Sequence, residues 1–378
     1  MLSSKELTIK GLIQSKDGIH LTGYIQNREA DPSHLKEQLS QIRNEAYEFL
    51  APVMSVDERI KFLAPIDHLL SDLRVMIQMK GNIGIFRKKD AFRVLSLPVD
   101  VEPSCIVATS FHVKPLLRWI QTDQGFLLLG LNPTGAFLFS GDQNSLSKID
   151  SFSFEPLPLY GDEREADVLS SERRIFSLLK PIHFWLTELT SHTRPRLFVA
   201  GDPTLTKAFC EDSTYTNLEL IPINDSFDES QLNTLAERVR KLRRREVALK
   251  LEKAILEFHL AEEMNLAKKN IFQIAKAAVQ GRVRKLIVAD GIRIFGKIDP
   301  KSGGLAIHPY DLDHEDDDLL DDLAQTVIAQ GGEVIVASRD EIPKGRPILA
   351  ILNEKTSETL TLVEKIKNSI PLNKEMPS

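Results

Sequence analysis

The pattern of hydrophobic and polar residues predicts helices and strands that alternate along the whole chain. Residues 18–27 alternate with the two-residue period of a strand, and Asp31 followed by Pro32 then marks the start of a helix. A second helical region follows, after which residues 82–98 predict two strands around a charged turn. Together these elements form a first αβ block that ends near residue 121.

A second block begins at Gly125 with a strong hairpin signal. Two apolar runs flank the sequence Asn-Pro-Thr-Gly at 132–135, which favours a tight turn. Residues 155–174 are polar and contain proline, so we expect an exposed loop there that leads into a helix. A buried strand at 194–202, a helix and a strand at 218–223 complete the block.

Beyond Glu229 the chain again alternates between helices and strands, which indicates a layered α/β domain. The predicted elements begin with a long helix at 229–264 and a shorter helix at 270–280. A strand at 283–289 follows, with a hairpin turn into a second strand at 292–298. An acidic helix at 320–327 and strands at 333–337 and 348–352 complete the domain.

These three blocks define the predicted fold class, an α/β protein with three αβ domains. A chain of 378 residues is too long for one ordinary core, and two or three domains are usual at this length. We place the domains at residues 1–121, 122–230 and 231–378, and the last domain ends in a polar tail.

Composition narrows the class of protein. With 42% hydrophobic and 27% charged residues, the sequence is typical of a soluble globular chain, and no run approaches the roughly 20 apolar residues that span a bilayer. The first residues contain no signal-peptide core. Two cysteines far apart in the sequence exclude a disulfide framework and a zinc ribbon, so we expect a cytoplasmic protein.

The charges are unevenly distributed, although the net charge of −6 argues against a protein whose whole surface coats nucleic acid. Three groups of cations are candidate RNA contacts. The first group lies on one side of the long helix and comprises Arg240, Arg243 and Arg244. The second surrounds the first charged turn and comprises Lys88, Lys89 and Arg93. The third follows the helix at 270–280 and comprises Arg282, Arg284 and Lys285. The alternative for the long helix is a solvated face with internal ion pairs such as Glu237 with Lys241.

Residues 308–318 contain several possible oxygen and nitrogen ligands, but their spacing matches no known metal site. We interpret these acids as the solvated start of a helix, where negative charge is favoured, and we expect no metal and no cofactor. The turn at 200–209 departs from the phosphate-binding loop pattern at two places, so we expect Asp202 or Thr204 to cap a helix instead. Nothing in the sequence names a catalytic residue.

The stretch AKAAVQGRVRKLIVADG, residues 275–291, is interpreted first as a fold element. Asn270 is expected to cap its helix, and Gly281 suits the left-handed position after the helix end. The stretch passes from helix to strand, whereas a phosphate cradle lies where a strand passes into a helix.

Several short motifs in this order resemble a known family. They are NIGIF followed by FHVKPLL in the first block, LFVAGDPTLTKAF in the second, and AAVQGRVRKLIVADG, AQGGEVIVAS and EIPKGRPILAIL in the third. Over about residues 18–352 the chain resembles the bacterial relatives of the archaeal and eukaryotic peptide-chain release factors and of Pelota.

The resemblance implies a first domain that enters the ribosomal decoding region and a middle domain with a ribonuclease-H-like fold. It implies a C-terminal α/β/α sandwich like that of the kink-turn-binding ribosomal proteins, which in the family also meets a translational GTPase. The implied partners are therefore the ribosome, its RNA and such a GTPase, with neither a membrane nor DNA.

The sequence departs from the release factors in two motifs. It contains no Gly-Gly-Gln, the tripeptide that places water at the peptidyl-tRNA ester, and no Asn-Ile-Lys-Ser stop-codon motif. We therefore expect no peptidyl-tRNA hydrolysis, and a non-catalytic translation factor that acts near the A site in ribosome rescue or hibernation. Two alternatives stay open: a metal-dependent RNA hydrolase that uses the acids of 308–318, and a protein-interaction scaffold that docks through its acidic helix.

Overall fold

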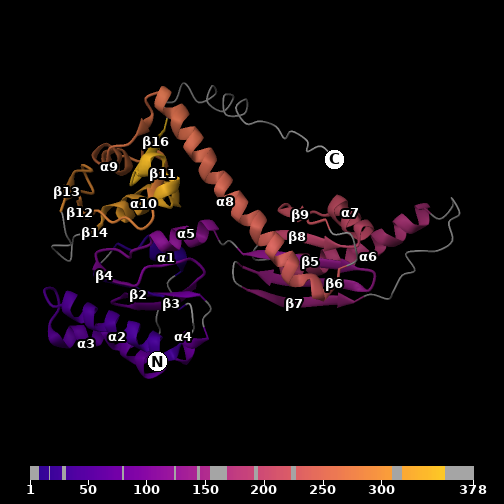
Figure 1. Ribbon diagram of the computed structural model, residues 1–378, viewed down its shortest axis with the longest axis horizontal. Coiled ribbons are helices and arrows are strands. Elements are labelled where there is room, and N and C mark those ends of the chain that lie inside the picture. The colour runs from indigo at the N-terminus through magenta and orange to yellow at the C-terminus, as the bar shows by residue number, and fades with distance from the viewer. Residues whose placement is uncertain are drawn as a thin grey trace. The chain divides into compact units, whose positions relative to one another are not determined.

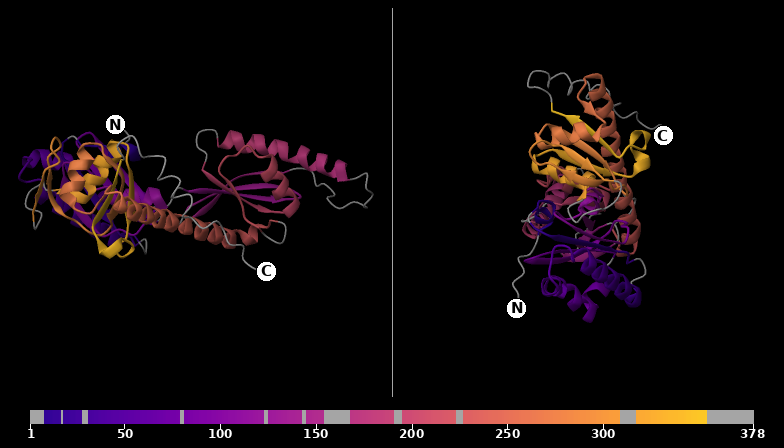
Figure 2. Two further views of the ribbon diagram at one scale, coloured as in Figure 1. Left: turned by 90° about the horizontal axis from the view of Figure 1, so that it is seen from above. Right: turned by 90° about the vertical axis from the view of Figure 1, so that its left-hand side faces the viewer.

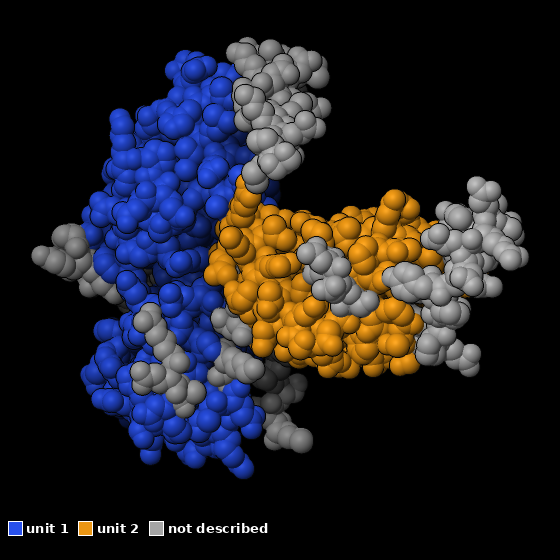
Figure 3. All heavy atoms as spheres, turned by 45° about the vertical axis from the view of Figure 1, so that its right-hand side comes forward, with its two compact units in different colours: residues 1–121, 248–378 blue, residues 122–247 orange. Residues whose placement is uncertain are grey.

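The computed structural model divides the chain into two compact units (Figures 1 and 3). Unit 1 comprises residues 1–121 and 248–378, and unit 2 comprises residues 122–247. The structure describes residues 8–16, 18–27, 31–78, 81–122, 125–142, 145–153, 168–190, 195–222, 227–308 and 317–353. The division into three domains at 121 and 230 stays a prediction.

The amino-terminal part of unit 1 is a four-stranded antiparallel sheet with helices on both faces. The sheet has the order β3-β2-β1-β4, with strands β1 (His20–Ile25), β2 (Asn82–Lys88), β3 (Ala91–Leu97) and β4 (Ser104–Ala108). The helices are α1 (Ile9–Ile13), α2 (Pro32–Phe49), α3 (Val56–Ser71), α4 (Arg74–Ile77) and α5 (Lys114–Thr122). Helices α2, α3 and α4 lie on one face of the sheet, and α1 and α5 lie on the other.

Local signals explain where these elements begin. The Asp31 side chain accepts a hydrogen bond from the Ser33 amide and Pro32 is the first residue of α2, which confirms the predicted helix start. All six residues of β1 are buried because both faces of the sheet are covered. Leu21 and Ile25 pack against α2 and α3, whereas Tyr24 points to a core shared with the carboxyl-terminal part of the unit.

The carboxyl-terminal part of unit 1 contains a second sheet with the order β10-β16-β11-β15. Its strands are β10 (Ala267–Lys268), β16 (Ile348–Leu352), β11 (Val283–Ala289) and β15 (Glu333–Ala337), and β11 is parallel to β15 and antiparallel to β16. Helices α9 (Ile271–Val279) and α10 (Leu319–Ala329) contribute to the shared core on one face, while α8 (Leu232–Glu263) supplies Leu251 and Phe258 to the other. Short 3-10 helices occur in this part at η3 (Arg339–Glu341) and η4 (Pro343–Gly345), and a third, η2 (Glu229–Gln231), lies in unit 2.

Two details of this part confirm the interpretation of residues 270–291, and one corrects it. The Asn270 side chain accepts from the amides of Phe272 and Gln273, and Gly281 has a φ of 66°. The predicted hairpin at 290–291 is wrong, however, because β12 (Phe295–Ile298) pairs with β13 (Leu305–Ile307) and β14 (Asp317–Asp318) in a separate sheet. Strand β11 cannot accept it, since β15 and β16 already occupy both of its edges.

Unit 2 is built on a five-stranded sheet with the order β7-β6-β5-β8-β9. The strands are β5 (Phe126–Asn132), β6 (Gly135–Gly141), β7 (Leu146–Ser153), β8 (Arg196–Gly201) and β9 (Leu218–Leu220). The first three are antiparallel, and β8 and β9 are parallel to β5 and β8 respectively. In the register of β5 with β6, Asn132 is opposite Gly135, which confirms the predicted hairpin.

Helices cover both faces of this sheet (Figure 2). On one face lie α6 (Val168–Leu189) and α7 (Pro203–Asp212), and on the other lies the first part of α8. Gly130 is required on β5, because a Cβ there would lie 2.5 Å from the ring of Phe227. The Asp202 carboxylate accepts from the amides of Thr204 and Leu205, so the predicted cap of α7 is confirmed.

Candidate functional site

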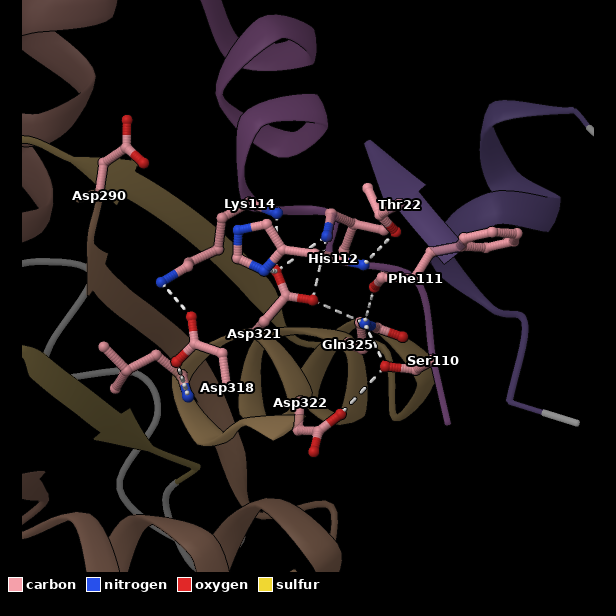
Figure 4. Close-up of polar contacts among 12 residues, drawn as sticks. Thr22, Ser110, Phe111, His112, Lys114, Asp290, Asp318, Asp321, Asp322 and Gln325 are labelled. Atoms are coloured by element: carbon pink, nitrogen blue, oxygen red, sulfur yellow. Dashed lines mark hydrogen bonds and ion pairs between the residues drawn. The ribbon is translucent and has the colours of Figure 1, made fainter. Parts of the chain in front are cut away.

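A buried network of polar side chains joins residues 110–114 to α10 inside unit 1 (Figure 4). Residues 110–113 lie between β4 and α5, and α10 lies about two hundred positions further along the chain. The first segment and the α5 helix that follows it share one hydrophobic core with α10, which includes Val113 and Leu116 on one side and Leu320 and Leu323 on the other. Apolar packing alone would tolerate sliding between such surfaces, whereas hydrogen bonds to fixed atoms do not.

Asp321 is the centre of the network. Its carboxylate accepts hydrogen bonds from the Val113 amide at 2.9 and 3.0 Å and from the Lys114 amide at 2.7 Å. These amides are at the start of α5, so Asp321 caps that helix from another element and places negative charge at its positive end. Gln325, one turn further along α10, donates to Asp321 at 2.8 Å and to the Phe111 carbonyl at 2.8 Å.

Lys114 makes the second connection. Its Nζ lies 2.5 Å from Asp318 Oδ2 and donates to the Ile292 carbonyl oxygen at 2.5 Å. The side chains of Lys114 and Asp318 are 2% and 5% exposed, so this ion pair is shielded from water. Asp318 also accepts from the amides of Leu320 and Ile294, and it thereby caps α10 and holds the segment that precedes β12.

Burial changes the protonation of the acids in this network. Loss of hydration, with the nearby Asp318 charge, raises the pKa of Asp321 to about 7, although Lys114 and the Val113 amide act against the rise. Loss of hydration also raises the pKa of the half-buried Asp322 to about 6, with Lys16 opposing. Burial, together with the Lys114 charge, lowers the pKa of His112 well below its usual value, so the imidazole beside Asp321 is neutral. The network therefore takes up protons between about pH 6 and 7.

Beside the network lies a cavity of about 330 Å³. Lys114, Arg118, Asp290 and Arg293 contribute charges of both signs to its wall, the neutral His112 also lines it, and Arg118 is 2.6 Å from Asp290. Among the described residues, no group of three or more histidine, cysteine, aspartate or glutamate side chains is arranged to hold a metal ion. The observed contacts fix the position of residues 110–114 relative to α10.

The predicted cations of the long helix differ in exposure. Arg240 and Arg243 are each only 13% exposed, whereas Arg244 is 62% exposed. Arg240 donates to the carbonyl oxygens of Asp142 and Ser145 and pairs with Glu237 at 2.7 Å, and Arg243 pairs with Glu246 at 2.9 Å. The structure therefore engages two of the three guanidinium groups inside unit 2 and leaves Arg244 the most open to a partner.

The six predicted cations of unit 1 divide in the same way. Lys285 is 8% exposed and lies 3.0 Å from Glu257 and 3.2 Å from Glu333, and Arg284 pairs with the same Glu257 at 3.3 Å. Arg282 is exposed.

At the first charged turn, Lys89 is exposed, Arg93 is half-buried, and Lys88 donates to the Ser15 hydroxyl at 3.1 Å. The fold thus brings Arg284 and Lys285 together on one acid, Glu257. Their role as RNA contacts stays a prediction.

The acidic segment is only partly described. Residues 309–316, which hold most of the proposed ligands, lie outside the described residues. The interpretation of the following acids as a helix start is confirmed at Asp318, which caps α10. The expectation that this start is solvated is wrong at Asp318, which is 8% exposed and pairs with Lys114 of α5.

Sequence reasoning missed the buried network altogether. Its members are separated by more than two hundred residues, and each aspartate taken alone is a typical first-turn acid. The one signal was the motif FHVKPLL, which contains both His112 and Lys114.

In the part of the chain that the structure describes, no helix is both long enough and apolar enough to cross a membrane.

Comparison with known proteins identifies a family for part of the chain. The model of bacterial archaeo-eukaryotic release factor family 3 matches residues 125–282. We refer to residues 125–282 as the release-factor-family region. The release-factor-family region covers the described part of unit 2 from Gly125 onward, the whole of α8, and α9. The resemblance to the release factor and Pelota relatives is thereby confirmed. None of the curated protein sequences compared with the chain matches it.

Three solved structures show a weaker likeness. Dom34 from S. cerevisiae, described as a translation termination-like factor that interacts with Hbs1, is 12% identical over 73% of this chain and 80% of its own, with a TM-score of 0.40. Pelota from Archaeoglobus fulgidus is 14% identical over 73% and 80%, with a TM-score of 0.31. A chain in a model of ribosome-bound archaeal Pelota and ABCE1 is 11% identical over 93% and 95%, with a TM-score of 0.40. At these scores the likeness carries no argument about domain arrangement, ligands or partners.

Proposed function

We propose that the protein is a ribosome-associated translation factor that acts near the A site, in rescue of stalled ribosomes or in hibernation. The observation that carries this proposal is the match of residues 125–282 to a release factor family. We propose that it acts in the cytoplasm with the ribosome, ribosomal RNA and a translational GTPase as partners. The strand order of unit 2, three antiparallel strands followed by two parallel ones, supports a ribonuclease-H-like middle domain.

The proposed role is binding without hydrolysis. The full sequence contains no Gly-Gly-Gln, so it lacks the group that would place water against the peptidyl-tRNA ester. In the release-factor-family region the corresponding loop falls near residues 157–171, of which 157–167 lie outside the described residues. A factor of this kind occupies a site on the ribosome and leaves the chemistry to another component.

The cations suggest how such binding is divided over the surface. We propose that Lys89, Arg244 and Arg282 contact ribosomal RNA, because these three side chains are exposed. Arg240, Arg243, Arg284 and Lys285 each pair with an acid of their own unit, and a phosphate would have to displace that acid. With a net charge of −6, binding would be local and strongly dependent on salt.

Co-sedimentation with purified ribosomes tests the proposal. The full-length protein should pellet with 70S ribosomes at low salt, and the bound fraction should fall steeply as salt is raised. A release assay with ribosomes that carry peptidyl-tRNA should show no hydrolysis above background. A protein that stays in the supernatant with empty, stalled and hibernating ribosomes alike would overturn the proposal, and peptide release would overturn its non-catalytic part.

A further inference from the structure

The cavity beside the buried network lies between the amino-terminal and carboxyl-terminal parts of unit 1. Its volume of about 330 Å³ is at the lower end of the range for small-molecule sites, roughly 300–1,000 Å³. One wall comes from the segments 24–26, 100–104 and 112–118, and the other comes from residues 290–293 and Ser338. A molecule in this cavity would therefore contact both parts of unit 1.

Most of the cations on this wall are already paired. Lys114 lies 2.5 Å from Asp318, and Arg118 lies 2.6 Å from Asp290. The exposed Arg293 differs from them, because its guanidinium forms no ion pair or side-chain hydrogen bond with any residue in the described ranges. A guanidinium presents its donors in a fixed fork that matches the two oxygens of a carboxylate. The cavity therefore offers one open position for an anionic group.

The charge of Arg293 acts on the buried part of the wall. Burial, and then the charges of Lys114 and Arg293, lower the pKa of His112. Burial and the Asp321 charge raise the pKa of Tyr24, and Arg293 acts against that rise. An anion bound at Arg293 would offset its charge, so binding should change the environment of the His112 ring.

The amino-terminal side of the cavity offers hydrogen-bond acceptors. Asp100 and Glu102 line it, and both side chains are exposed. The Ser104 hydroxyl donates to the carbonyl oxygen of Glu102 at 3.2 Å, and no described residue donates to the Glu102 carboxylate. The Gln26 amide nitrogen donates to the Val101 carbonyl oxygen at 3.0 Å, which leaves the Gln26 side-chain oxygen as a further acceptor. This side suits a group that donates hydrogen bonds.

The balance of charge favours one class of ligand. Three cations and three acids line the cavity, so their charges cancel; they are Lys114, Arg118 and Arg293, and Asp100, Glu102 and Asp290. A dianion such as a phosphate ester would bring two uncompensated charges to this wall, and a polyamine would bring the opposite excess. A zwitterion brings no excess. Its carboxylate only accepts and its ammonium only donates, so one end matches Arg293 and the other matches Glu102.

We propose that the cavity of unit 1 binds a small zwitterion of the α-amino acid class, with its carboxylate on Arg293 and its ammonium on the acidic side at Glu102. Because the bound molecule contacts both parts of unit 1, it stabilises that unit by mass action. The proposal is independent of the proposed function, since no residue of the pair is a candidate RNA contact.

Thermal unfolding of the full-length protein tests the proposal, with each common protein amino acid as a probe. Each is added at about 1 mM, tenfold above a Kd of about 100 µM, and an amino acid that binds should raise the unit 1 transition by about 3 °C. Trp119 reports this transition in a Trp185→Phe background. The unit 2 transition, reported by Trp185 in a Trp119→Phe background, should not move. If no amino acid raises the unit 1 transition, the proposal is wrong.

Calorimetric titration with the amino acid that binds best then tests each end of the site. Arg293→Gln should weaken binding about 10- to 100-fold, and Glu102→Gln about 10-fold. Arg74→Gln makes the same substitution at an arginine that is 84% exposed and lies outside the cavity wall, so it should change nothing. The amine that lacks the carboxylate and the acid that lacks the ammonium should each bind at least about 10-fold more weakly than the amino acid.

Two further measurements separate a zwitterion from a simple anion. Ribose 5-phosphate should not raise the unit 1 transition, and the NMR signal of the His112 ring, assigned by its loss in His112→Gln, should shift when the amino acid binds. Binding that survives Arg293→Gln, or that becomes stronger in Glu102→Gln, would overturn the proposal. So would ribose 5-phosphate binding more tightly than every amino acid.

Discussion

Helices α6 and α10 are held in their units by different forces. In unit 2, α6 packs through Ile175, Leu179, Ile182 and Leu186, a stripe without charge. In unit 1, α10 combines an apolar side with two buried aspartates that bind the start of α5. Apolar packing is strong but not directional. Hydrogen bonds of charged groups are directional, and removal of one partner lowers stability because the other group is left buried without a partner.

The difference suggests why unit 1 uses charge where unit 2 does not. Its shared core joins segments from the two ends of the chain, and those segments have no short connection to fix their register. A buried ion pair is weak evidence for added stability, but one misplaced by a single helical turn would leave uncompensated charges. We therefore regard the network as a device for specificity, and the following experiments compare the two units on this point.

Removal of the buried cation should have the largest effect. Lys114→Ala leaves Asp318 buried without its partner, and we expect the free energy of unfolding of unit 1 to fall by about 3–5 kcal/mol. The two tryptophans allow separate measurement, because Trp119 lies in α5 of unit 1 and Trp185 in α6 of unit 2. In a Trp185→Phe background, urea unfolding followed by fluorescence should report the loss from Trp119.

Two controls accompany this variant. Lys148→Ala removes an exposed pair with Glu229 in unit 2, where the side chains are 42% and 53% exposed, and should change stability by less than about 1 kcal/mol. The double change Lys114→Met with Asp318→Asn removes both charges while asparagine keeps the helix cap, so stability should return to within about 1 kcal/mol of the original. Full loss of stability in the double variant would show that charge is not what unit 1 depends on.

An apolar truncation should damage unit 2 by a comparable but smaller amount. Ile182 is fully buried, and Ile182→Ala should lower the free energy of unfolding of unit 2 by about 3 kcal/mol through lost contacts and a residual cavity. With Trp119→Phe as background, Trp185 should report this loss, and the unit 1 transition should stay where it was. A matched shift in both transitions would mean that the units do not unfold separately.

The pH dependence should distinguish the two units at a lower energy scale. The folded pKa of Asp321 is raised to about 7 from an ordinary value near 4, so its favourable contribution is complete at low pH and is lost as the pH rises through 7. Each pH unit within that window corresponds to about 1.4 kcal/mol. Between pH 6.5 and 5 the stability of unit 1, relative to Asp321→Asn, should increase by about 2 kcal/mol.

The comparison with Asp321→Asn is necessary because a neighbour opposes the effect. The pKa of His112 is lowered by burial, so its contribution is present above its ordinary value and is lost on acidification. Asp322, with a pKa raised to about 6, acts in the same direction as Asp321, and both histidine and Asp322 remain in the variant. Parallel pH profiles for the original protein and Asp321→Asn would contradict the assignment of proton uptake to Asp321.

The same division between local and distant interactions explains what the sequence could predict. The features that the sequence predicts correctly depend on residues within a few positions of one another. They are the starts of α2, α7 and α9, the turn at 132–135 and the left-handed Gly281. The pairing of β12 was not predicted, because whether β11 has a free edge depends on where β15 and β16 lie.

The candidate site follows the same rule. The sequence shows which residues are cationic but not which of them are already paired, so Arg244 and Lys285 were equivalent until the fold placed Glu257 and Glu333 beside the lysine. The acids of α10 were predicted at the correct end of a helix, and their burial was missed because α5, which covers them, lies far away in the sequence.

The smallest effect should come from an exposed cation. Arg244→Ser removes a side chain that is 62% exposed and whose pair with Glu237 is long, at 3.4 Å, and also exposed. The free energy of unfolding should therefore change by less than about 0.5 kcal/mol. If Arg244 contacts a ribosomal phosphate, the slope of log affinity against log salt should become shallower by about 1.

Lys285→Ser should show the opposite pattern. It leaves Glu257 and Glu333 without their ammonium partner, so unit 1 should lose stability while the salt slope for ribosomes is unchanged. Ribosome binding measured over a salt series, beside urea unfolding of each variant, separates the two outcomes. An equal change of slope in both variants would mean that burial in the free protein does not decide which cations reach the ribosome.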